Sequence, residues 1–243
     1  TNAADIDAFL AEAWALDPSK TVKEELAAQI AVIGENMNIR RFEKFVAANG
    51  FVESYIHANG RIAILVEFEG ACTAATKVCA KDVAMQIAAM NPQYISRSEI
   101  SDEELAKIRE ITIDSALNDP ASLPKPIQNE LYAKVETEKL FSEEDLAILA
   151  EKKNDKYLYN FLSKEAIAKL AELALAGKAA YVDNKIFAGL VEGRISKQVK
   201  EISLLDQVYV KAEDGKQTVA AYLASVNKAL VIAKFVRFEV GEG

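Results

Sequence analysis

Two Asn-Gly pairs restrict most strongly what this chain can fold into, namely Asn49-Gly50 and Asn59-Gly60. Asn-Gly accepts positive φ at both central positions of a tight turn, so it favours two-residue β-hairpins. The pairs separate three runs rich in β-branched and aromatic residues, at 39–48, 51–57 and 61–69. The sequence therefore predicts a three-stranded antiparallel meander.

Pairing the residues outward from each turn sorts their side chains by face, because alternate residues of a strand point to opposite sides. One face collects apolar side chains from all three runs: Phe42, Val46, Phe51, Tyr55, His57, Ile62, Ile64, Val66 and Phe68. The opposite face is mixed and includes Glu43, Ser54 and Glu67. We expect the first face to be a core face.

A helix is expected to follow the meander over residues 73–90 and to end at Asn91-Pro92, since proline disfavours helical geometry in the preceding residue. At about 100° per residue, one stripe contains Cys79, Val83, Gln86, Ile87 and Met90. A second apolar stripe contains Val78, Met85 and Ala89. The second stripe is either further core or a partner surface.

The remaining chain is mostly helical in pattern. Apolar periodicity, caps and breakers predict helices at 3–16, 21–33, 101–117, 127–139, 142–152, 163–176, 184–200 and 218–227. Residues 157–161 are either a short strand or a connection between helices, and strands are predicted at 202–210 and 231–240.

These elements indicate an α+β fold, with two small antiparallel-sheet subdomains and packed helices. A helical coiled-coil hairpin with a large helical insertion separates the two subdomains. The expected division is a helical lead-in at 1–35, an N-terminal core subdomain at 36–100, a coiled-coil region at 101–200 with its insertion at about 119–183, and a C-terminal core subdomain at 201–243.

The composition excludes several classes of function. A net charge of −8 argues against direct nucleic-acid binding, and no apolar run is long enough to cross a membrane. Cys72 and Cys79 lie in the same predicted helix, roughly 10 Å apart along its axis, which is too far for a disulfide. Reduced thiols, no recognisable signal peptide and a cytoplasmic location are expected. One histidine and two cysteines exclude the usual zinc sites.

No catalytic, cofactor-binding or metal-binding motif is present. The sequence contains no phosphate-binding glycine loop and no nucleophile elbow. His57 is interpreted as a packing or turn-end residue, because the predicted pairings place no nucleophile beside it. The abundant carboxylates are interpreted as solvated helix faces, and their number alone is a weak reason to consider an enzyme.

Five segments resemble the elongation factor Ts family in the order in which that family carries them. They are 33–41 (IGENMNIRR), 55–67 (YIHANGRIAILVE), 81–92 (KDVAMQIAAMNP), 191–194 (VEGR) and 235–243 (FVRFEVGEG). Together they cover most of the chain. The resemblance implies a guanine-nucleotide exchange factor for elongation factor Tu, which promotes GDP release and carries out no covalent chemistry.

The resemblance also implies the residues that contact the partner. Contacts with the GTPase domain fall on Ile62 and Ala63 and on Gln86, next to Met85. Contacts with a β-barrel domain fall on Val210 and Lys211, after the family-like run at 204–209. The family prefers glycine where this chain has Ala63.

Three differences from the family lead to further expectations. The family's N-terminal three-helix module and its T-D-F-V motif are not found, so we expect a fragment with impaired exchange. The helical insertion at 119–183 is larger than the family's usual short hairpin. It either extends the coiled coil against elongation factor Tu or mediates self-association into a homodimer. A scaffold that has lost exchange activity is the alternative function.

Overall fold

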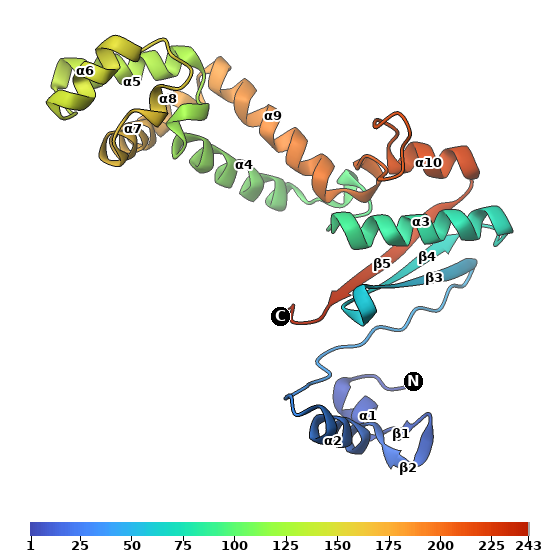
Figure 1. The fold of residues 1–243 in the computed structure, drawn as a ribbon. Coiled ribbons are helices and arrows are strands. Elements are labelled where there is room, and N and C mark those ends of the chain that lie inside the picture. The colour runs from blue at the N-terminus through green and yellow to red at the C-terminus, as the bar shows by residue number, and fades with distance from the viewer. Residues whose placement is uncertain (243) are drawn as a thin grey trace. The chain divides into compact units, whose positions relative to one another are not determined.

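The computed structural model describes residues 1–242 and consists of two compact units. The first unit contains Thr1–Ala89 together with the C-terminal residues from Leu223 onward, and the second contains Met90–Tyr222. The predicted α+β class is confirmed, because many helices accompany two small antiparallel sheets (Figure 1). None of the helices within residues 1–242 is long and apolar enough to span a membrane.

The larger sheet has three antiparallel strands in the order β3-β4-β5. They are β3 (Gly50–His57), β4 (Ile62–Glu69) and β5 (Val231–Glu239). β3 and β4 pair from His57↔Ile62 to Gly50↔Glu69. This register is the one predicted by counting outward from Asn59-Gly60, so the predicted hairpin is confirmed.

The turn between β3 and β4 is broader than the predicted two-residue type. Ala58, Asn59 and Gly60 have φ values of 51°, 56° and 94° and form the short 3-10 helix η1 (Ala58–Gly60). Asparagine and glycine tolerate this left-handed region better than other residues, which explains why the chain reverses here.

The predicted first strand at 39–48 and the turn at Asn49-Gly50 are wrong. Residues 34–48 contain no strand, and Gly50 instead begins β3. A Cβ at Gly50 would lie 1.8 Å from the carbonyl oxygen of Phe68, so glycine is required by close approach of β4. The predicted meander left one edge of β4 unpaired. In the structure β5, from the other end of the chain, pairs with that edge.

The predicted core face is confirmed along the central strand. Ile64, Val66 and Phe68 are at most 1% exposed, and the Phe51 ring stacks on Phe68 at 5.3 Å between centroids. Val46 is 73% exposed and does not belong to this core. His57 is also exposed, with its Nδ1 atom 2.9 Å from the Tyr55 hydroxyl, so it is a turn-end residue.

Helix α3 (Ala74–Met90) ends before Asn91-Pro92 as predicted and lies along the sheet in Figure 1. In its first predicted stripe, Cys79, Val83, Gln86 and Ile87 are buried, whereas Met90 is 45% exposed. The second stripe is largely accessible, since Val78 and Ala89 are exposed and Met85 is half-buried. The apolar face that covers the sheet is therefore the first stripe.

The cysteine geometry differs from the prediction. Cys72 is exposed and precedes α3, while Cys79 is buried within the helix. No disulfide joins the two cysteines within residues 1–242.

The N-terminal segment is less helical than expected. It contains α1 (Ile6–Ala11), β1 (Ala13–Trp14), β2 (Asp17–Thr21) and α2 (Val22–Ile33). The predicted helix at 3–16 is therefore correct only over Ile6–Ala11. α2 is confirmed: Thr21 and Glu24 form a capping box at its start, and Gly34 ends it with a φ of 78°.

In the second unit, α4 (Asp102–Leu117) packs against α9 (Lys185–Ile202). Ser101 and Asn184 cap these helices, and an ion pair joins Arg109 to Glu192. The elements between them are η3 (Pro120–Ser122), α5 (Lys125–Glu138), α6 (Glu143–Lys152), η4 (Leu158–Asn160), α7 (Lys164–Ala176) and α8 (Lys178–Val182). Residues 157–161 thus form a connection between helices rather than a strand.

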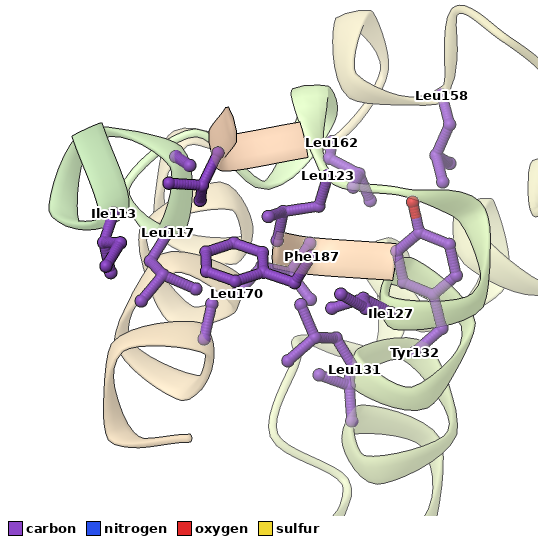
Figure 2. Close-up of a cluster of buried hydrophobic side chains, with 14 of the residues drawn as sticks. Ile113, Leu117, Leu123, Ile127, Leu131, Tyr132, Leu158, Leu162, Leu170 and Phe187 are labelled. Carbon is purple, nitrogen blue, oxygen red and sulfur yellow. The ribbon is translucent and has the colours of Figure 1, made fainter. Parts of the chain in front are cut away.

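The helices of the second unit share one apolar core (Figure 2). Leu117 from α4, Ile127 and Tyr132 from α5, Leu170 from α7 and Phe187 from α9 are all fully buried. Residues of the predicted insertion therefore pack into the same core as the two long helices.

The C-terminal part corrects the predicted second sheet. α9 continues to Ile202 and is followed by the 3-10 helix η5 (Leu204–Asp206), so the predicted strand at 202–210 is wrong. A second 3-10 helix, η2 (Arg97–Glu99), lies near η5, where Arg97 pairs with Asp206. α10 (Val219–Val226) is confirmed. The final strand is confirmed as β5, but it joins β4 and forms no separate C-terminal sheet.

The carboxylate of Asp145 links the starts of α6 and α7. It accepts hydrogen bonds from the Ser142 hydroxyl at 2.8 Å, from the Ser163 backbone N–H at 2.9 Å and from the Ser163 hydroxyl at 2.7 Å. Burial raises the pKa of Asp145, but the hydrogen bonds from Ser163 and Ser142 outweigh it, so the pKa lies below the ordinary 3.8.

We predict that Asp145→Ala lowers the free energy of unfolding by about 2–4 kcal/mol, because both serine caps lose a charged acceptor. Urea unfolding followed by circular dichroism measures this change. Since the folded pKa is depressed, the stabilisation is present above about pH 4 and is lost as the pH falls through the folded value. Glu144→Ala, on the same first turn, is the control and should change stability little.

Candidate partner-binding surface

The hairpin end of the sheet presents two of the expected contact residues. Ile62 and Ala63 are the first residues of β4 and pair with Glu239 and Phe238 of β5. Because they are neighbours on a strand, they point to opposite faces. Ile62 is half-buried on the core face, and Ala63 is exposed on the other face, opposite the 68% exposed Ile56.

A cleft of about 270 Å³ opens beside Ala63. Its walls come from three segments, at 38–41, 60–63 and 238–241. The backbone N–H of Val240 donates to the carbonyl oxygen of Arg61 at 2.9 Å, which ties the hairpin to the end of β5. The cleft is therefore built by residues that are far apart in the sequence.

Side-chain contacts hold the segment 38–45 beside β5 without a backbone ladder. The guanidinium of Arg41 lies 4.4 Å from the centre of the Phe238 ring, and the Lys234 ammonium lies 4.4 Å from the centre of the Phe45 ring. Lys234 also pairs with Glu43 at 3.5 Å. Cation–π contacts of this kind are favourable at partly exposed sites.

Two carboxylates lie among the arginines at this end of the sheet. Glu239 accepts a hydrogen bond from Arg237 at 2.8 Å, and Arg61 Nε lies 3.4 Å from its other oxygen. The hydrogen bond from Arg237, followed by the nearby charges of Arg237 and Arg61, holds the pKa of Glu239 below its ordinary value. Glu242 lies farther from its partners, at 3.8 Å from Arg41 and 3.9 Å from Arg237.

The other expected contact residues lie elsewhere. Gln86 is fully buried in α3, next to the half-buried Met85. Val210 is 48% exposed and Lys211 is exposed, and both belong to the second unit. They follow Tyr209, whose ring stacks on Tyr222 at 4.1 Å. Ile62 and Ala63 thus lie side by side at the hairpin end of the first unit, whereas Val210 and Lys211 belong to the second unit.

Two tyrosines of the second unit are hydrogen-bonded to each other. Tyr132 donates a hydrogen bond to the Tyr159 hydroxyl at 3.0 Å, and burial raises the pKa of both phenols. Among residues 1–242, no three His, Cys, Asp or Glu side chains form a metal-binding group.

Comparison with known proteins decides the family. The family model described as Elongation factor TS matches residues 1–242. The chain belongs to the elongation factor Ts family. Proteins named Elongation factor Ts from Clostridium perfringens, Clostridium novyi and Halothermothrix orenii are 35%, 34% and 32% identical to it. These matches cover 100%, 98% and 100% of this chain and 60%, 59% and 59% of the relatives.

The family membership confirms the resemblance found in the sequence motifs. Because the chain spans only about 60% of the length of the curated relatives it matches, the activity and partners of the whole protein are treated as proposals. The contact roles of Ile62, Ala63, Met85, Gln86, Val210 and Lys211 likewise stay predictions.

Sequence reasoning missed the cleft and its charged residues. Arg40 and Arg41 end one family-like segment, Arg61 lies in another, and Arg237 and Glu239 lie in a third. The available signal was the repeated occurrence of arginine in segments characteristic of elongation factor Ts. Their convergence depends on the pairing of β4 with β5, which the sequence pattern did not predict.

We predict that Gln86→Ala lowers the free energy of unfolding by about 1–3 kcal/mol, because it removes a fully buried polar side chain and leaves space behind. Thermal or urea unfolding measures the change. Val78→Ala, at an exposed position of the same helix, should stay within about 0.5 kcal/mol of the parent. Equal stability of all three proteins would contradict the structural role of Gln86.

Proposed function

We propose that this chain acts in translation elongation as a guanine-nucleotide exchange factor for elongation factor Tu. It binds the GDP-bound GTPase in the bacterial cytoplasm, disturbs the magnesium and phosphate site, and promotes release of GDP without covalent chemistry. The observation that carries this proposal is the match of residues 1–242 to the elongation factor Ts family. The exposed rim at Ala63 supplies a surface for the contact.

Reciprocal linkage explains how a binding surface can accelerate nucleotide release. If the factor prefers the nucleotide-free partner, its binding weakens nucleotide affinity by the same factor by which nucleotide weakens its own binding. The shift is limited by the difference between its affinities for the two states. The proposed activity therefore needs a surface of suitable shape and no catalytic residue.

The proposal assigns two contacts to the partner. Ile62 and Ala63, with Met85 and Gln86, would engage the GTPase domain, and Val210 with Lys211 would engage a β-barrel domain. The half-exposed Val210 and the exposed Lys211 suit a contact with an apolar centre and a charged rim.

The chain alone should promote exchange only weakly. The family's T-D-F-V motif, whose phenylalanine enters the GTPase domain, does not occur in the 243 residues. Without that side chain, the binding energy of the remaining surface has less effect on the magnesium site. We therefore propose that the described chain is a docking platform whose full activity requires this motif.

We predict that Ala63→Arg weakens binding to elongation factor Tu at least about tenfold, because a long charged side chain then projects from the exposed rim. Biolayer interferometry measures the affinity. Stopped-flow release of a fluorescent GDP analogue measures exchange, with this chain and with a version that carries the T-D-F-V motif upstream.

Ala75→Arg is the matched control, since Ala75 is also exposed but lies in the first turn of α3. It should leave binding unchanged. If neither version binds elongation factor Tu or accelerates release, the proposed function is wrong. If Ala63→Arg and Ala75→Arg behave alike, Ala63 is not in the contact.

A further inference from the structure

Arginine is concentrated at one end of the three-stranded sheet. The chain has seven arginines, of which Arg40, Arg41 and Arg61 line the cleft beside Ala63. A fourth, Arg237, adjoins it through Glu242, which lies 3.8 Å from Arg41 and 3.9 Å from Arg237. Glu239 and Glu242 are the carboxylates that pair with them. Among residues 1–242, these four guanidiniums and two carboxylates carry a local positive charge, in a chain whose net charge is −8.

The guanidiniums retain donor capacity. Arg40 donates to the main-chain carbonyl of Glu242 and pairs with no carboxylate among residues 1–242. Arg61 is 67% exposed, and its Nε atom lies 3.4 Å from Glu239. The Nε atom of Arg237 is buried without a hydrogen-bond partner in the described chain. Because each guanidinium offers five N–H donors, most of them remain unused here.

Glu242 is held loosely compared with Glu239. The Glu239–Arg237 contact is a hydrogen bond of 2.8 Å, whereas Glu242 lies 3.8 Å from Arg41 and 3.9 Å from Arg237. Both distances exceed hydrogen-bonding range. The Arg41–Glu242 pair is also half-exposed on both sides, so it contributes little energy. Another carboxylate could therefore take the place of Glu242.

The cleft also has apolar walls. Ile39, Ala63, Phe238 and Val240 line it together with the arginines. Its volume of about 270 Å³ lies below the range of typical small-molecule sites, which begin at roughly 300 Å³. The size suits one or two side chains, and the overall negative charge of the chain disfavours a polyanion such as nucleic acid.

We propose that this cleft receives a Glu or Asp side chain, flanked by apolar residues, from a partner protein. The incoming carboxylate displaces that of Glu242 from Arg41 and pairs with the exposed Arg61. The cleft adjoins Ala63, so this proposal extends the proposed function and identifies elongation factor Tu as the partner only if that function holds. The preference for a carboxylate can be tested without that partner.

The first experiment titrates the full ¹⁵N-labelled chain with acetyl-Leu-Glu-Leu-amide and follows backbone amide and arginine Nε–H signals by NMR. The expected result is saturable binding in the millimolar range, with shifts at Gly60, Ala63 and the four arginines. Acetyl-Leu-Gln-Leu-amide should bind at least about threefold more weakly, because it lacks the charge. Added potassium chloride should reduce the difference.

Two charge variants should change the affinity for the Glu peptide in opposite directions. Arg61→Gln removes an exposed donor and should weaken binding of the Glu peptide about threefold. Glu242→Gln removes the tethered competitor and should strengthen it about threefold. Arg109→Gln, at a 49% exposed arginine in the second unit, is the control and should bind as the parent does.

Equal binding of the Glu and Gln peptides, or shifts spread over the whole surface, would overturn the proposal. Weaker or unchanged binding by Glu242→Gln would do the same, because a structural role for Glu242 predicts no gain. Failure of the chain to bind elongation factor Tu, combined with selective binding of the Glu peptide, would reject the proposed function and leave the cleft proposal standing.

Discussion

The pairing of β4 with strands on both sides is the interaction on which the first unit depends. β3 lies next to β4 in the sequence, but β5 comes from the other end of the chain, and the intervening residues include the whole second unit. Closing so long a loop costs conformational entropy that grows only slowly with length. The backbone ladder and the burial of Ile64, Val66 and Phe68 offset that cost.

The second unit is stabilised independently of that sheet. Its helices bury Tyr132, Leu170 and Phe187 in one core, and Asp145 fixes the starts of two of them through serine caps. A helical insertion of this size is tolerated because it brings its own apolar side chains and satisfies its own helix ends. The long connection between β4 and β5 is therefore structured rather than a costly open loop.

The surface at the hairpin end follows from the same strand pairing. β5 places Phe238 next to Ala63, and its C-terminal extension brings Glu242 between Arg41 and Arg237. Apolar walls and unpaired guanidinium donors then share one cleft. A protein that acts by preferring one state of its partner needs surfaces of this kind, where charge gives orientation and apolar contact gives affinity.

The sequence by itself determined the features that depend on neighbouring residues. Asn59-Gly60 set the register of the β3–β4 hairpin, Asn91-Pro92 ended α3, and Thr21 and Gly34 bounded α2. The spacing of Cys79, Val83 and Ile87 identified the buried face of α3. Turns, caps and helical stripes arise from local sterics and hydrogen bonds, so short stretches are sufficient to specify them.

Only the tertiary structure decided which strands pair and which residues form the cleft. Asn49-Gly50 resembled a turn, yet Gly50 is needed for close approach to Phe68. Residues 39–48 have the composition of a strand, yet β5 pairs with β4. Several segments of this chain have the β propensity needed to pair with the free edge of β4. The choice among them rests on contacts between residues far apart in the chain, which no local pattern records.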